Sequence, residues 1–114
     1  MGSFYKQQLN DWKRTLDIKA NLCYDIGGAQ DPMIGMTKSW DVKEYKIVDL
    51  AVPHVEKVRP DIEQDLNEVW AVKDQADLIL CLGVSDYIIN PNVFMDNIYD
   101  ALQMGGTAWV EFPF

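Results

Sequence analysis

The chain has 114 residues, of which 18 are acidic and 10 are basic, so its formal net charge is -8 at pH 7. This length predicts one domain with a single core. The acidic balance argues against a nucleic-acid or anionic-membrane surface, and neither a membrane span nor a signal peptide is visible in the sequence. We therefore expect a cytoplasmic protein without nucleic-acid or membrane partners.

Residues 1–20 are predicted to form a leading amphipathic helix that precedes the main domain, residues 21–114. The apolar stripe of this helix recurs at helical spacing and consists of Tyr5, Leu9, Trp12 and Leu16. Its opposite, polar face carries Lys6, Gln8, Asp11 and Lys13. An aromatic stripe at this spacing is usually a packing surface, so we expect the helix to pack on a sheet. The alternative that Tyr5 or Trp12 covers a cofactor pocket stays open.

Residues 21–32, NLCYDIGGAQDP, contain an apolar run, an acidic residue near its end and a turn of small residues. The run has no polar alternation, which favours a strand buried on both faces of a parallel sheet. Gly27, Gly28 and Ala29 leave the backbone nearly bare, so main-chain N–H groups can approach a bound ligand closely. Because ordinary strand ends have similar turns, the motif by itself leaves a structural role open. Residues 31–40 are predicted to be a short helix or an irregular loop.

A second strand is predicted over residues 44–50, EYKIVDL, with Asp49 near its carboxyl end. Asp49 lies 21 positions after Gly28, a spacing at which an acid at the end of a strand can accept hydrogen bonds from ribose hydroxyls. The alternative is a solvated strand end. Residues 51–60 are predicted to be a loop that carries His54, the only histidine, and a surface position suits this residue better than a metal or catalytic site.

Three further strands and one helix follow in the second half of the chain. Short strands are predicted over residues 61–65 and 77–82, and a last strand over residues 107–112. Between the strands over residues 77–82 and 107–112, Asn90 as N-cap and Pro91 as first residue predict the start of a helix, and Gly105 and Gly106 predict its end. Its inward row is Phe94, Ile98 and Leu102. The alternation of strands with loops or helices predicts an α/β fold with a parallel sheet.

The two cysteines, Cys23 and Cys81, both lie inside apolar runs, and no CxxC or Cys/His spacing indicates a metal. We expect both to be free thiols in a reducing compartment and expect no metal site.

Four segments resemble the class I S-adenosylmethionine-dependent methyltransferases, and they cover the chain from about residue 21 to the C-terminus. CYDIGGAQDP resembles the glycine-rich first motif of that family, and YKIVDL resembles its acidic, ribose-binding strand. PDIEQDLNE resembles the strand whose aspartate meets the adenine amine. ADLILCLGVSDYIINPNVFMDNIYDALQMGGTAWVEFPF resembles the fourth strand, the following helix and the fifth strand with its L-x-x-G-G motif.

The resemblance implies a Rossmann-like parallel sheet of about five strands in the order 3-2-1-4-5 with flanking helices, truncated relative to the seven-stranded sheet of the family. It implies S-adenosyl-L-methionine as cofactor. Asp25 would lie near the methionyl amino group, Asp49 on the ribose diol and Asp65 on the adenine amine. The residues that the resemblance assigns to the cofactor are Asp25, Gly27, Gly28, Ala29, Asp49, Leu50, Asp65, Leu66 and Leu82.

The chain also departs from the family pattern. Ala29 and Asp31 stand where the family often has further glycines, and Gly83 with the pair Asp86 and Tyr87 stands where many members read Glu-x-x-Glu-His. We expect Asp86 and Tyr87 to contact the acceptor substrate and assign no catalytic residue, because holding an activated donor and a nucleophile in line can supply much of the rate.

Two functions are therefore expected from the sequence. The first is a methyltransferase, or its cofactor-binding portion, that acts on an unknown small-molecule acceptor. The second is a non-catalytic Rossmann-like binding module with a degenerate or lost cofactor site. A nicotinamide-dependent oxidoreductase is disfavoured because no Gly-x-Gly-x-x-Gly is present. The last strand would be an unprotected edge, so we also expect self-association through it and weak cofactor binding by the chain alone.

Overall fold

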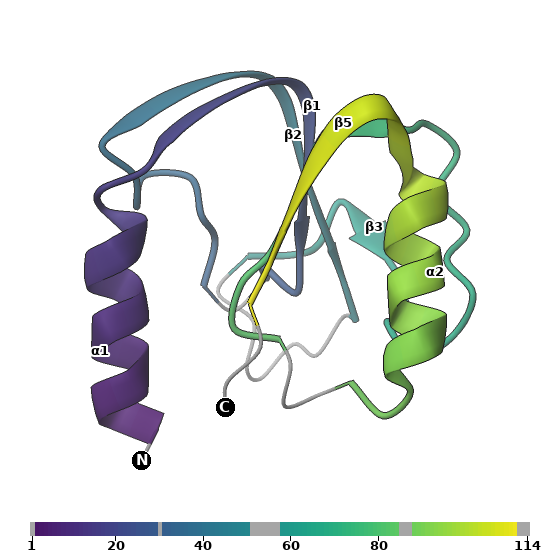
Figure 1. The fold of residues 1–114 in the computed structure, drawn as a ribbon, viewed down its shortest axis with the longest axis horizontal. Coiled ribbons are helices and arrows are strands. Elements are labelled where there is room, and N and C mark those ends of the chain that lie inside the picture. Colours follow the sequence, from purple (N-terminus) through teal and green to yellow (C-terminus); the bar gives the residue numbers. More distant parts are fainter. Residues whose placement is uncertain (1, 30, 51–57, 85–87, 112–114) are drawn as a thin grey trace.

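We describe a computed structural model of the chain, in which residues 2–29, 31–50, 58–84 and 88–111 are placed. Within these ranges the chain forms two helices and five strands (Figure 1). In chain order they are α1 (Gly2–Lys13), β1 (Asp17–Ile26), β2 (Ser39–Asp49), β3 (Ile62–Glu63), β4 (Ala76–Cys81), α2 (Pro91–Ala101) and β5 (Leu102–Val110).

The five strands form one sheet in the order β3-β2-β1-β4-β5, and every neighbouring pair is parallel. This arrangement confirms the predicted α/β fold and the strand order 3-2-1-4-5. The chain moves outward from β1 to β3 and then returns to the other side of β1 to form β4. The order of the strands therefore reverses between β1 and β4.

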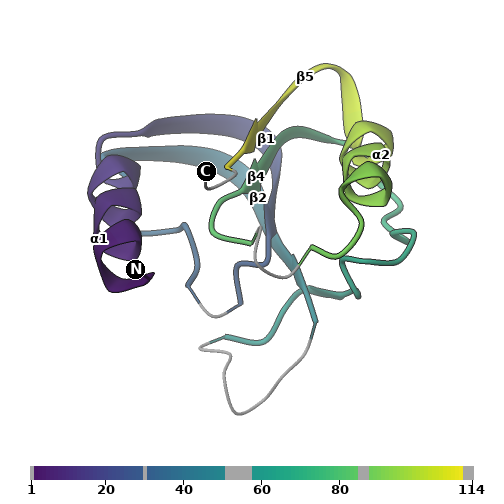
Figure 2. The same ribbon diagram turned by 60° about the horizontal axis from the view of Figure 1, so that its bottom comes forward.

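The two helices lie on opposite faces of the sheet (Figures 1 and 2). Side chains of β4 alternate between two apolar clusters, because successive residues of a strand point to opposite faces. Ile79 and Cys81 join a cluster that includes Phe94 and Ile98 of α2. The residues of β4 that point the other way join Leu16, Ile18 and Met33 in a second cluster. We call the two faces the α2 face and the α1 face.

The leading helix ends earlier than predicted, since α1 ends at Lys13 and β1 begins at Asp17. The Thr15 N–H donates to the Trp12 carbonyl at 2.9 Å, and a tight turn replaces the next helical turn. Residues 17–20 alternate between exposed and buried positions, and they pair with residues 39–42 of β2. The predicted helix over residues 1–20 is therefore wrong beyond Lys13, and β2 begins five residues before its predicted start.

The helix α2 begins as predicted, because the Asn90 side chain accepts a hydrogen bond from the Val93 N–H and Pro91 follows it. It ends at Ala101, however, and the prediction that Gly105 and Gly106 end it is wrong. Leu102 already pairs with Ala76 of β4, and the register shifts before the pairing continues at residue 107. Gly105 lies within β5 at a positive φ of 82°, a conformation that glycine adopts without strain.

The third strand is shorter than predicted and contains only Ile62 and Glu63. Both cysteines are buried free thiols, as predicted. Burial raises the pKa of each thiol well above its ordinary value, so both remain protonated and behave as small apolar side chains. No helix among the described residues has the length and apolar character needed to cross a membrane.

Candidate functional site

The loops that follow β1 and β4 meet at the carboxyl edge of the sheet, where the strand order reverses. Gly27 follows β1 with a positive φ of 75°, and a Cβ added at this position would lie 2.1 Å from Cγ1 of Val84, in the loop after β4. Only glycine satisfies both the backbone conformation and this close approach. In open α/β sheets, ligands bind at this reversal, outside the carboxyl ends of the strands.

Asp25 holds the segment that follows the glycine turn. Its side chain is 3% exposed, and its Oδ2 accepts hydrogen bonds from the Met33 N–H at 2.9 Å and from the Tyr45 hydroxyl. A Cβ added at Gly28 would lie 2.5 Å from Cγ of Asp25. The buried carboxylate therefore explains why residue 28 has no side chain.

The charge state of Asp25 is set mainly by its burial, which raises the pKa of its carboxyl from 3.8 to about 6. Hydrogen bonds from Tyr45 and from the Met33 N–H lower this pKa, as does the charge of Lys13, whereas the charge of Asp49 raises it. Burial and the adjacent Asp25 carboxylate raise the pKa of Tyr45. The Tyr45 hydroxyl therefore stays protonated and acts as a hydrogen-bond donor to Asp25.

Asp49 links the glycine turn to the end of β2. Its Oδ2 accepts a hydrogen bond from the Ala29 N–H at 3.1 Å, and its Oδ1 accepts one from the Leu50 N–H at 2.8 Å. The Gly27 N–H donates to the Val48 carbonyl at 2.8 Å, so a second hydrogen bond joins the glycine turn to the end of β2. Asp49 is half-buried and Leu50 is 51% exposed, so an acid and an apolar side chain stand together beside the glycine turn.

The remaining predicted residues lie around this centre. Leu66 is buried in the α2-face cluster, and its Cδ1 lies 3.9 Å from the position of a Cβ added at Gly27. Asp65 precedes it, after the outer strand β3, and its Oδ1 accepts a hydrogen bond from the Asn67 N–H at 3.0 Å. Leu82 packs on the opposite, α1 face.

The structure therefore brings Asp25, Gly27, Gly28, Ala29, Asp49 and Leu66 together. No hydrogen bond joins Asp65 to this group within the described part of the chain. Three residues discussed from the sequence, His54, Asp86 and Tyr87, lie outside the described residues, as does Phe112 at the end of the predicted last strand.

Two residues of this region were not predicted to belong to a site. Tyr45 was expected only to add bulk to β2, yet its hydroxyl also accepts a hydrogen bond from the Met33 N–H at 3.2 Å. Lys13 was expected on the polar face of the leading helix, yet it is 3% exposed. Strand alternation predicts that Tyr45 shares a face of β2 with Ile47, but only the register of the sheet, in which Ile47 pairs with Asp25, shows that this face meets the carboxylate. No sequence signal indicates the burial of Lys13.

Among the described residues, no group of three or more side chains suits a metal ion. Comparisons of the chain with protein families, with curated proteins and with solved structures found no match. The function must therefore be argued from the geometry of the chain itself.

Proposed function

We propose that this chain is an S-adenosylmethionine-dependent methyltransferase or the cofactor-binding portion of one. The observation that carries the proposal is the hydrogen bond from the Ala29 N–H to Asp49, at 3.1 Å. It joins a glycine turn after the first strand to an acid after the second strand, beside the point where the strand order reverses. This combination suits a nucleoside whose ribose lies over the carboxyl edge of the sheet.

The chemistry of the surrounding residues agrees with such a ligand. A carboxylate accepts hydrogen bonds from ribose hydroxyls, and the half-exposed Leu50 beside it offers apolar contact to an adenine ring. The acidic character of the chain, with a formal net charge of -8, favours a cationic ligand such as a sulfonium. The cofactor supplies an activated methyl group, so the residues of this chain would need mainly to bind and orient it.

In this proposal Gly27, Gly28 and Ala29 contact the cofactor, and Asp65 and Leu66 lie toward its adenine. Leu82, at the end of β4, contributes to the pocket wall. Asp86 and Tyr87 remain the proposed contacts to a small-molecule acceptor, on the basis of the family resemblance. A module of the same fold that binds the cofactor without turnover is the second candidate, and a methyl-donor consumption assay distinguishes the two.

Isothermal titration calorimetry with S-adenosylmethionine, S-adenosylhomocysteine and NAD tests the choice of ligand. We expect binding of the first two and not of NAD. Binding of NAD without binding of either adenosyl compound would overturn the proposal.

The substitution Asp49→Ala tests the ribose contact. A lost charge-assisted hydrogen bond costs about 1.5–3 kcal/mol, so the affinity for S-adenosylhomocysteine should fall roughly ten- to a hundredfold. Asp41→Ala is the matched control, because Asp41 is an exposed acid on the same strand. Equal affinities of the two variants would mean that Asp49 is a solvated strand end and not a ribose contact. Thermal unfolding of both variants shows whether the fold is intact.

A further inference from the structure

The strand β5 lies at one edge of the sheet, and within the described residues no strand pairs with its outer side. Its nine residues, LQMGGTAWV, include no charged side chain and no proline. Edge strands of natural proteins are usually protected from pairing with another strand by charges, proline, bulges or short length. The register shift in β5 comes before residue 107, so residues 107–110 form a regular and unprotected edge.

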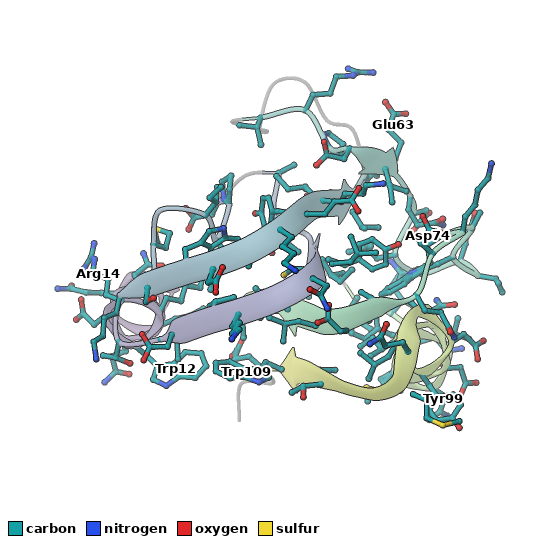
Figure 3. All side chains as sticks on the ribbon, turned by 90° about the horizontal axis from the view of Figure 1, so that it is seen from above. Trp12, Arg14, Glu63, Asp74, Tyr99 and Trp109 are labelled. Atoms are coloured by element: carbon teal, nitrogen blue, oxygen red, sulfur yellow. The ribbon has the colours of Figure 1, made fainter. Side chains whose placement is uncertain are left out.

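The opposite edge of the sheet is protected. It is formed by β3, which has only two residues. Glu63 of β3 forms an exposed ion pair with Arg59 at 2.7 Å, and Figure 3 shows Glu63 at this side of the sheet. Because β3 offers a short and charged edge, β5 of another copy cannot extend the sheet there. Copies that associate through β5 must therefore join β5 to β5, and this contact closes as a two-fold dimer.

Exposed apolar side chains accompany the β5 edge. The rings of Trp12 and Trp109 lie side by side, with centroids 6.0 Å apart, and Figure 3 shows both of them, and Tyr99, along the β5 side of the sheet. Trp12 is 43% exposed, Tyr99 80% and Met104 99%. Apolar area that gathers beside an unpaired strand is typical of an interaction surface.

The backbone of residues 107–110 fixes how a second strand can pair with it. The Glu111 N–H donates to the Cys81 carbonyl of β4 at 3.1 Å. Since backbone groups alternate in direction along a strand, those of Trp109 also face β4, whereas those of Ala108 and Val110 face outward. An antiparallel copy with its two-fold axis at Trp109 pairs Ala108 with Val110 of the other copy, twice, and places Trp109 opposite its own copy.

Charge favours a second copy of this chain as the occupant of the edge. The chain has a formal net charge of -8, so two copies repel each other over most of their surfaces. Residues 102–110 carry no charge, and the repulsion is smallest where such uncharged strands meet. A basic partner, which the overall charge would attract, finds no acid on this strand to pair with.

We infer that two copies of the chain associate through β5, in antiparallel pairing centred on Trp109, and form a continuous sheet of ten strands. The pairing gives the self-association expected from the sequence a definite geometry. It places the Trp12 and Trp109 rings of both copies on the same face of the joined sheet, and it does not depend on the proposed cofactor.

The test measures the mass of the chain in solution by sedimentation equilibrium over a range of concentrations. Two variants alter the edge: Ala108→Pro removes an outward N–H without removing a hydrogen bond to β4, and Thr107→Glu adds a charge at an exposed position of the strand. Ser39→Glu is the matched control, because Ser39 is an exposed hydroxyl residue on the inner strand β2. Thermal unfolding shows whether each variant is folded, and Thr107→Glu decides if Ala108→Pro unfolds.

We expect the wild-type chain and Ser39→Glu to form dimers and no larger species, and each edge variant to raise the dissociation constant of the dimer at least about tenfold. Because salt screens the repulsion between two acidic copies, added sodium chloride should strengthen the dimer. A wild-type chain that stays monomeric up to about 1 mM, or that forms larger assemblies, would overturn the inference. Edge variants that dimerise as tightly as the wild type would also overturn it, because the contact would then lie elsewhere.

Disulfide trapping with oxidised glutathione tests the position of the axis. In Trp109→Cys the two introduced thiols belong to a directly opposed pair with Cα atoms about 4.5 Å apart, which is within disulfide range. In Thr107→Cys, the control, the two copies of residue 107 lie about 13 Å apart along the strands. Both native cysteines are buried. We expect a disulfide-linked dimer from Trp109→Cys and not from Thr107→Cys, and the reverse result would overturn the pairing centred on Trp109.

Discussion

Replacing Asp25 by asparagine should change how the stability of the chain depends on pH. Burial raises the pKa of Asp25 from 3.8 to about 6, against the opposing effects of Tyr45, the Met33 N–H and Lys13. Since the folded state binds this proton more tightly than the unfolded state, the resulting stabilisation is fully present below pH 3.8 and is lost as the pH rises through about 6. At about 1.4 kcal/mol per pKa unit, the complete loss is roughly 3 kcal/mol, of which roughly 2 kcal/mol falls between about pH 4.5 and pH 8.

The assay is urea denaturation of the wild-type chain and of Asp25→Asn at several values of pH in that range. Asparagine resembles the protonated acid in shape and carries no charge at any of them. The free energy of unfolding of the wild type, relative to that of the variant, should therefore fall by roughly 2 kcal/mol as the pH rises. Asp41→Asn, at an exposed position of β2, corrects for the change in net charge. A relative stability that stays constant within about 0.5 kcal/mol would refute the reasoning, because it would mean that the Asp25 carboxyl is not desolvated in the folded state.

Two further predictions concern packing around the site. Gly27→Ala should destabilise the fold by about 2–4 kcal/mol in urea denaturation, because the new Cβ would lie 2.1 Å from Val84 and the residue would keep a positive φ. The double variant with Val84→Ala should be at least about 1 kcal/mol more stable than the sum of the two single changes predicts. Strict additivity of the two changes would contradict the contact. Asn97→Ala should lower the free energy of unfolding by about 2–4 kcal/mol. The buried Asn97 amide accepts a hydrogen bond from the Trp70 N–H at 3.2 Å and donates one to the Glu68 carbonyl at 2.7 Å, and the variant loses both. Asn92→Ala, at an exposed position of the same helix, is its control, and similar midpoints for the two variants would show that the amide does not hold that segment.

Several features of the fold follow from local sequence and were predicted from it. The apolar runs that contain Cys23 and Cys81 have no polar alternation, so they indicate strands with both faces buried, as β1 and β4 are at these positions. Asn90 and Pro91 form a start signal for α2 within a few residues of chain. Gly27 lies in the turn predicted after the first strand, and it takes a positive φ there, a conformation that glycine adopts without strain. In each case the residues that carry the signal are neighbours in the sequence, so no distant partner is needed to interpret them.

Other features were decided by partners that are distant in the sequence. Residues 17–20 belong to β1 because residues 39–42 pair with them, although the helical stripe before them appeared to continue through Leu16. Leu102 belongs to β5 because it pairs with Ala76.

The dependence on distant partners also explains why the sequence predicted the residue types of the site but not their burial. The residue types at Asp25, Gly28 and Asp49 indicated a ligand-binding edge, but the burial of Asp25 follows from contacts with Met33 and Tyr45. Lys13 is buried in the folded chain, although a lysine at the end of a helix is equally suited to solvent by its local sequence. Local patterns thus determined the centres of the main strands and the acids at their carboxyl ends, because those signals lie within a few neighbouring residues. The tertiary structure decided where the strands begin and end and which charged side chains are buried, because both depend on partners that are distant in the sequence.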